Sequence, residues 1–110
     1  MKDDKLYLKH IVDASTKIEK FVSTLSYRDF VLDDRTHLAV IRLLEIIGEA
    51  ANHISTETIK SITGIPWKDI VGLRNILIHD YFNVDLEIVW KTIQENIPEI
   101  TEKIQNYLSV

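Results

Sequence analysis

The chain has 110 residues, of which 45% are hydrophobic, and this size and composition predict one folded domain over residues 1–110. It contains no cysteine, which excludes a disulfide scaffold, a zinc site built on thiolates and a cysteine nucleophile. Thirteen Lys and Arg residues against 17 Asp and Glu give a net charge of -4, the wrong sign for a protein that coats nucleic acid. No apolar stretch resembles a signal peptide or a membrane span, so we expect a cytoplasmic protein without membrane contact.

Long helices joined by short loops are expected, because the sequence has only three glycines and two prolines. The first helix is predicted from about residue 5 to residue 25, where apolar residues recur at three- and four-residue steps. A polar break over residues 26–34 ends it. Asp33 or Asp34 can then cap a second helix that runs to about residue 54.

The second helix is apolar almost all round, which is typical of an element that packs on several sides. One polar seam interrupts it. Arg42, Glu45, Glu49 and His53 follow one another at steps of three, four and four, so they lie within an arc of roughly 80°. This seam is the one place where charged groups of the second helix can meet a neighbour.

The rest of the chain predicts two or three further main helices. After a short helical piece, Pro66 suits the first turn of a third helix that ends at His79. Asn83 or Asp85 can cap a fourth, and Pro98 marks a kink or a fresh start before the last helical stretch. The predicted fold class is therefore all-α, an up-and-down bundle of four to five helices.

Arg74 falls on the predicted buried face of the third helix, within about 60° of Trp67 and Ile78. A buried guanidinium keeps its charge and needs a carboxylate partner. The seam supplies Glu49, with Glu45 as the second candidate. The alternative is that Arg74 lies near a helix end and reaches water, with the seam simply solvated.

His79 follows Arg74 by five residues, which on a continuous helix is an offset of about 140° and 7.5 Å. By itself, His79 is typical of a surface or capping residue. Glu49 and His53, four residues apart, are the nearest approach to a metal-ligand pair, and one such pair does not predict a metal site. No glycine-rich phosphate loop is present, so no cofactor is expected.

The stretch from Arg74 to Tyr81 reads R-N-x-x-x-H-x-Y and resembles the signature of the HepT-like ribonucleases. This family is the small toxin branch of the HEPN superfamily, whose general motif is an arginine followed a few residues later by a histidine. Three other stretches are similar to it as well: Ile47-Gly48-Glu49-Ala50, Ile65-Pro66-Trp67 and Val89-Trp90. The resemblance thus extends, in order, over nearly the whole chain.

The resemblance implies a metal-independent endoribonuclease that works as a homodimer and cleaves RNA through the RNA's own 2′-OH. Two copies of the motif would meet at one cleft, because one chain supplies only one such histidine. Arg74 and His79 would be the catalytic residues. Glu49 would position the arginine, Asn75 would orient the substrate or the histidine, and Asp80 would support the motif.

In this family the tyrosine that matches Tyr81 accepts AMP from a minimal nucleotidyltransferase antitoxin, the partner in a type VII toxin–antitoxin system. Negative charge and bulk two residues from His79 would obstruct the substrate path. From composition alone, Tyr81 beside Phe82 is a half-buried packing residue with its hydroxyl at the surface. The alternative function is a non-catalytic helical module that dimerises or binds a partner through the motif face.

Overall fold

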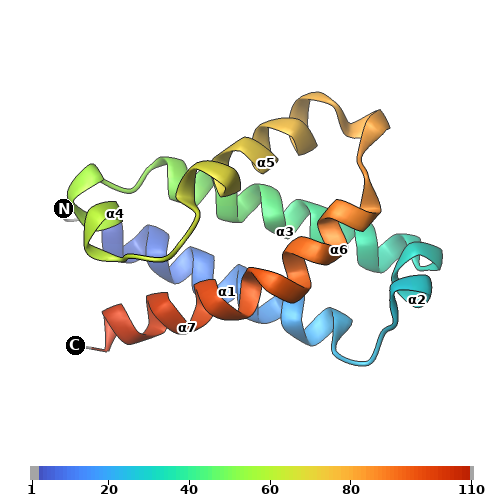
Figure 1. The fold of residues 1–110 in the computed structure, drawn as a ribbon, viewed down its shortest axis with the longest axis horizontal. Coiled ribbons are helices and arrows are strands. Elements are labelled where there is room, and N and C mark those ends of the chain that lie inside the picture. The colour runs from blue at the N-terminus through green and yellow to red at the C-terminus, as the bar shows by residue number, and fades with distance from the viewer. Residues whose placement is uncertain (1–2, 110) are drawn as a thin grey trace.

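A computed structural model describes residues 3–109, and every regular element in that range is a helix, which confirms the predicted all-α class (Figure 1). A 3₁₀ turn over Tyr81–Asn83 joins two of the α-helices. The α-helices are α1 (Asp4–Val22), α2 (Tyr27–Leu32), α3 (Asp34–Asn52), α4 (Thr56–Ser61), α5 (Trp67–His79), α6 (Leu86–Glu95) and α7 (Ile97–Leu108).

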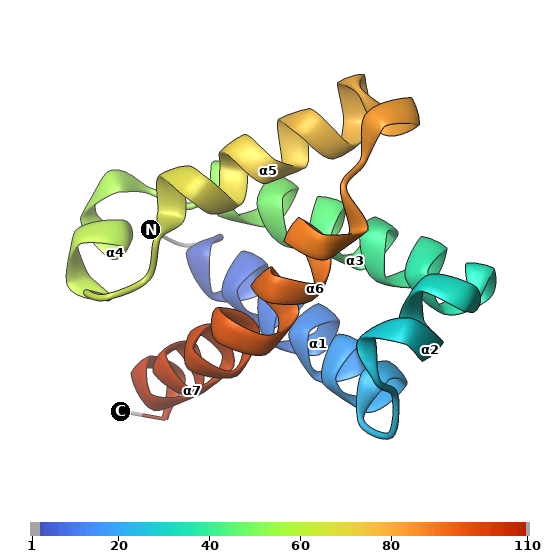
Figure 2. The same ribbon diagram turned by 45° about the vertical axis from the view of Figure 1, so that its right-hand side comes forward.

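Helix α3 lies at the centre of the bundle, between α1 on one side and α5 on the other (Figure 1). This position explains why its sequence is apolar almost all round. Figure 2 shows α7 beside α1, with α6 leading into it from the side of α3. No helix in the described part of the chain is both long and apolar enough to cross a membrane.

The predicted break over residues 26–34 contains a helix that the sequence analysis missed. Ser26 and Asp29 form a reciprocal cap at its start, because the Ser26 hydroxyl accepts from the Asp29 amide at 3.1 Å and the Asp29 carboxylate accepts from the Ser26 amide at 3.2 Å. Only Phe30 of α2 is buried. A six-residue helix with one buried side chain is too short to show a hydrophobic period.

Capping residues fix the other boundaries. Of the two candidates for α3, Asp33 is the cap and accepts from the Thr36 amide at 3.1 Å. Asp85 caps α6 by accepting from the Glu87 amide at 2.9 Å. Pro98 lies in the first turn of α7, so it marks a fresh start and not a kink. The first helix ends at Val22, three residues before the predicted end.

The core lies where α1, α3, α6 and α7 meet, and most of its residues were on the predicted inner faces. Phe21 and Tyr107, near the ends of α1 and α7, are exposed. The largest fully buried apolar side chains are Leu8, Ile11, Ile18, Phe30, Val40, Ile47, Leu77, Val89, Ile97, Ile100 and Ile104.

The buried face of α5 is rotated from the predicted one. Ile78 was expected inside and is 36% exposed, whereas its neighbour Leu77 is 2% exposed. The inner face follows Trp67, Ile70, Arg74 and Leu77, at steps of three, four and three, because the main contacts of α5 with a long helix are those with α3. Among the described residues, the outer face of α5 has no comparably extensive contact with a long helix.

A buried carboxylate ties the start of α1 to the loop after α3. Asp4 accepts from the Ser55 amide at 3.0 Å, from the Ser55 hydroxyl at 2.5 Å and from the Thr58 hydroxyl at 2.6 Å. These hydrogen bonds, first from Ser55 and then from Thr58, hold the pKa of Asp4 far below its ordinary value against the opposing effect of burial. The tether brings the first turns of α1 to the end of α3, where the site described next begins.

Candidate functional site

Helices α3 and α5 come into close contact at a glycine. A Cβ atom added at Gly48 would lie 2.2 Å from the Arg74 Cβ and 3.1 Å from the Ile70 carbonyl oxygen, so only glycine fits there. The alkyl part of Arg74 therefore packs directly on the backbone of α3. This contact gives a physical reason for the Ile47-Gly48-Glu49-Ala50 string found in the sequence.

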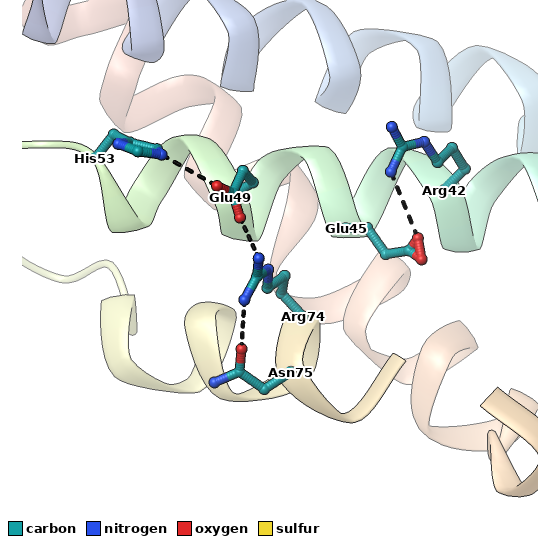
Figure 3. Close-up of polar contacts among 6 residues, drawn as sticks. All are labelled: Arg42, Glu45, Glu49, His53, Arg74 and Asn75. Carbon is teal, nitrogen blue, oxygen red and sulfur yellow. Dashed lines mark hydrogen bonds and ion pairs between the residues drawn. The ribbon is translucent and has the colours of Figure 1, made fainter. Parts of the chain in front are cut away.

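Arg74 and Glu49 form an ion pair across the two helices, as the sequence predicted (Figure 3). The guanidinium Nη2 contacts Glu49 Oε2, and Nη1 donates to the Asn75 side-chain oxygen at 2.7 Å. The Arg74 side chain is only 24% exposed, and its Nε is buried with no hydrogen-bond acceptor among the described residues. These contacts hold the guanidinium group in one orientation and leave one N–H of each Nη atom without a partner among the described residues.

Glu45, the second candidate partner, pairs elsewhere. Its carboxylate lies 3.7 Å from the guanidinium of Arg42, three residues earlier on the same helix (Figure 3). The Arg42 side chain is 70% exposed, so this pair contributes little to stability. The seam of α3 is consequently not simply solvated, because its two carboxylates hold two different arginines.

His53 extends the network at the end of α3, and the sequence analysis missed this role. Its Nε2 donates to Glu49 Oε1 at 3.0 Å, and its ring stacks on Tyr7 of α1 with centroids 5.1 Å apart and planes inclined by 15°. The hydrogen bond from His53, and after it the charge of Arg74, lower the pKa of Glu49, although burial opposes them. The spacing of four residues between Glu49 and His53 was the feature of the sequence that could have predicted this hydrogen bond.

These side chains line a pocket of about 400 Å³ between α1, α3 and α5. Its apolar lining residues are Ile46, Ala50 and Ile78. The polar lining residues are Tyr7, His10, Arg42, Glu45, Glu49, His53 and Arg74. Among the described residues, no three His, Asp or Glu side chains gather in a way that could hold a metal ion. The pocket thus combines two arginine–glutamate pairs with aromatic rings.

His79 is the last residue of α5 and is exposed. It is not among the residues that line the pocket, and no described side chain forms a hydrogen bond with its ring. Because α5 is continuous from Trp67 to His79, Arg74 and His79 are offset by about 140° and 7.5 Å. One copy of the chain therefore does not point both groups at the same atom.

Asp80 ends α5 and holds the turn that follows His79. Its amide donates to the Ile76 carbonyl at 2.9 Å, and its carboxylate accepts from the Asn83 side chain at 2.8 Å. The Tyr81 side chain lies outside the part of the chain that the structure describes. Asn75, for which the resemblance implied a contact with substrate or His79, is hydrogen-bonded to Arg74.

The structure thus brings together Glu49, Arg74 and Asn75 of the predicted site, while His79 and Asp80 lie beyond them at the end of α5. The sequence analysis did not assign Tyr7, His10 or Arg42 to any site, because their partners lie on other helices or one turn away. Fold and site together define a small helical protein with an ion-paired arginine in a pocket and, on the same helix, an exposed histidine that has no hydrogen-bond partner among the described side chains.

Comparison with known proteins identifies the family. A family model described as Ribonuclease HepT-like matches residues 11–107. The "Probable ribonuclease HepT" of Thermococcus cleftensis is 42% identical over 101 residues, covering 92% of this chain and 92% of that protein. A Methanocaldococcus jannaschii protein with RNase in its name is 38% identical over 104 residues, covering 94% of this chain and 95% of that protein.

A more distant relative is the "mRNA nuclease HepT" of Shewanella oneidensis, 29% identical over 100 residues, covering 70% of this chain and 73% of that protein. No solved structure matches the chain at a significant level. The chain belongs to the HepT-like ribonuclease family. The resemblance drawn from R-N-x-x-x-H-x-Y is confirmed, and with it the class of enzyme, an endoribonuclease.

Proposed function

We propose that the protein is the toxin of a type VII toxin–antitoxin system and cleaves RNA without a metal ion at a site shared by two copies of the chain. The observation that carries this proposal is the arrangement on α5. Arg74 is held rigidly by Glu49 and Asn75, and His79 is free and exposed at the end of the same helix. A fixed cation and a free proton-transfer group are the two parts that such cleavage needs.

Arg74 supplies the cation. A guanidinium has five N–H donors, and Glu49 and Asn75 engage only one of them each. The Nε–H is buried, but the second N–H of Nη1 and of Nη2 can bind two oxygens of a phosphodiester in the fork geometry that arginine favours. Glu49 therefore positions the guanidinium and leaves it free to bind. The net charge of -4 per chain opposes RNA binding elsewhere, so we expect binding confined to this site and sensitive to salt.

His79 moves the protons. A base removes the proton from the 2′-OH, the 2′-oxygen attacks the phosphorus, and the bond from phosphorus to the 5′-oxygen breaks as an acid protonates that oxygen. The products are a 2′,3′-cyclic phosphate and a 5′-OH. Histidine can serve as either the base or the acid. With one such histidine per chain, the two roles are filled when His79 of each copy lies on opposite sides of one phosphate in a symmetric homodimer.

The exposed apolar side chains near the motif support the homodimer. Ile76, on the outer face of α5, is 55% exposed and Phe82, in the turn that follows α5, is 85% exposed, and the main contacts of α5 with a long helix of the described residues are those with α3. Exposed apolar side chains close to one another on a surface are typical of a protein–protein contact. A contact through this face brings the two copies of His79 toward each other.

Regulation through Tyr81 is part of the proposal. Transfer of AMP from ATP to its hydroxyl by a minimal nucleotidyltransferase antitoxin, with release of pyrophosphate, would add a phosphodiester two residues from His79. The new negative charge would compete with RNA for Arg74, and the adenosine would occupy the path to the scissile phosphate. Family membership and the match of Tyr81 to the R-N-x-x-x-H-x-Y string support this assignment.

The test uses the chain purified without any partner. End-labelled cellular RNA is incubated with it in excess EDTA, beside the variant His79→Ala, and the fragment ends are analysed. We expect cleavage by the wild-type protein alone and 2′,3′-cyclic phosphate termini. Absence of cleavage by a folded, unmodified dimer across many RNAs would refute the proposal and favour the non-catalytic partner-binding module.

A further inference from the structure

The pocket beside Arg74 has one wall made of aromatic rings that the proposed cleavage reaction does not use. Tyr7 and His53 stack nearly parallel, and His10 meets the Tyr7 ring edge to face at a centroid distance of 6.0 Å. All three rings line the pocket, and two of them belong to exposed residues. The His53 side chain is 49% exposed although Tyr7 covers one of its faces. The other face of that ring is therefore available to a planar ligand.

Two arginine–glutamate pairs also line the pocket. Arg42 and Arg74 both line it, and each is paired with one carboxylate, Glu45 and Glu49 respectively. Arg42 is 70% exposed and keeps most of its donors free, so a second phosphate can reach it. A pocket of about 400 Å³ whose lining combines aromatic rings with guanidinium groups is typical of a site for a planar base carrying a phosphate.

We propose that this pocket is a base-stacking subsite for one nucleotide of the single-stranded RNA substrate. The base stacks on the free face of His53, extending the Tyr7–His53 stack, while the phosphates on its two sides contact Arg74 and Arg42. This inference rests on the proposed function, because Arg74 is the group that holds the scissile phosphate there. The subsite explains how a chain with a net charge of -4 binds RNA, since stacking needs no basic surface.

A free nucleotide offers the same base and phosphate chemistry as a strand of RNA. The two sources differ in the number of phosphates, because only a strand places one on each side of the base. The subsite as proposed therefore binds an oligonucleotide more tightly than a mononucleotide, by about tenfold or more.

The binding probe is a fluorescently labelled oligoribonucleotide with 2′-O-methyl groups throughout, which cannot be cleaved through its 2′-oxygen. Its affinity is measured by anisotropy for the wild-type protein and for His53→Phe and His53→Leu. Both variants lose the hydrogen bond to Glu49, and only Phe keeps an aromatic face. We expect His53→Leu to bind roughly tenfold more weakly than His53→Phe, the effect of one stacked base. Thermal melts establish that the two variants are equally folded.

The second comparison tests the contribution of Arg42 to binding of the strand. Arg42→Gln is matched with Arg28→Gln, which removes an exposed charge from α2, outside the pocket. We expect weaker binding only for Arg42→Gln. Uridine and adenosine 5′-monophosphates serve as competitors for the labelled strand, and competition at concentrations close to those of the unlabelled strand would assign the pocket to a free nucleotide and overturn the proposal.

The outcomes separate this subsite from the proposed function. Equal affinity of His53→Phe and His53→Leu for the strand overturns the subsite, and if the wild-type protein still cleaves RNA through His79, the ribonuclease proposal stands. Failure of the wild-type protein to bind the strand overturns the subsite as well. Strand binding that depends on the ring at residue 53, without any cleavage, supports the subsite and refutes the ribonuclease proposal.

Discussion

Replacing Gly48 with alanine tests how closely α3 and α5 must approach to position Arg74. The added Cβ would lie 2.2 Å from Arg74 Cβ, whereas ordinary contact begins at 3.4 Å, so the helices must separate locally by about 1.2 Å. The Ile70 carbonyl, 3.1 Å away, is backbone and cannot turn aside. Overpacking destabilises a core by about 1–3 kcal/mol, and a clash this short beside fixed backbone belongs at the upper end, about 2–3 kcal/mol.

Alanine also has a higher helix propensity than glycine, and this gain offsets about 1 kcal/mol of the destabilisation caused by overpacking. We therefore expect Gly48→Ala to lower the free energy of unfolding by about 1–2 kcal/mol and the melting temperature by about 5–10 °C. The displacement of Arg74 by about 1 Å should reduce cleavage by roughly 100-fold.

Gly72 provides the matched control. It lies on α5 as Arg74 does, and a Cβ added there meets nothing within 4 Å. Gly72→Ala should stabilise the protein by about 0.5–1 kcal/mol, because only the helix propensity changes. The assay is thermal denaturation followed by circular dichroism, with cleavage measured in parallel. A Gly48→Ala protein that melts at or above the wild-type temperature would refute the inferred close contact.

Three further predictions concern single side chains. Arg74→Ala should abolish cleavage and lower the melting temperature by about 3–8 °C, because the ion pair and the packing on α3 are both lost; a wild-type melt would contradict the stabilising role of these contacts. His79→Ala should abolish cleavage yet shift the melt by less than about 2 °C, since the residue is exposed; a large shift would make it structural. Asp4→Ala should lower the melting temperature by about 5–15 °C, whereas the exposed neighbour Asp3→Ala should not. Because the pKa of Asp4 is lower in the folded state, its stabilising effect is complete above about pH 4 and is lost as the pH falls further; urea unfolding of the wild-type protein and Asp4→Ala across this range should show the difference shrinking in acid.

The helices that pack along their length could be predicted from periodicity, and so could the pairing of Arg74. A charged residue on an apolar face needs a partner, and the polar seam of the apolar helix α3 offers Glu45 and Glu49. The short helix α2 could not be predicted in this way. Its reciprocal cap, formed by Ser26 and Asp29, is a short sequence pattern, and such a pattern predicts the start of a helix only where a helix is already expected.

The aromatic wall of the pocket was beyond sequence analysis for a different reason. Tyr7 and His53 are 46 positions apart and meet because Asp4 ties the start of α1 to Ser55. The spacing of residues within one helix cannot predict a contact between two side chains that lie on different helices. The rotation of α5 that exposes Ile78 and buries Leu77 was missed for a similar reason, since it depends on which single helix α5 packs against.

The most direct test of the shared site is a heterodimer in which one chain is wild type and the other carries His79→Ala. Two different affinity tags allow this species to be purified away from both homodimers, and a doubly tagged wild-type dimer serves as the control. Because each chain supplies one histidine to one phosphate, we expect the heterodimer to cleave RNA no faster than the His79→Ala homodimer. A heterodimer with about half the activity of the wild-type control would show that each chain cleaves on its own, and would contradict the shared site.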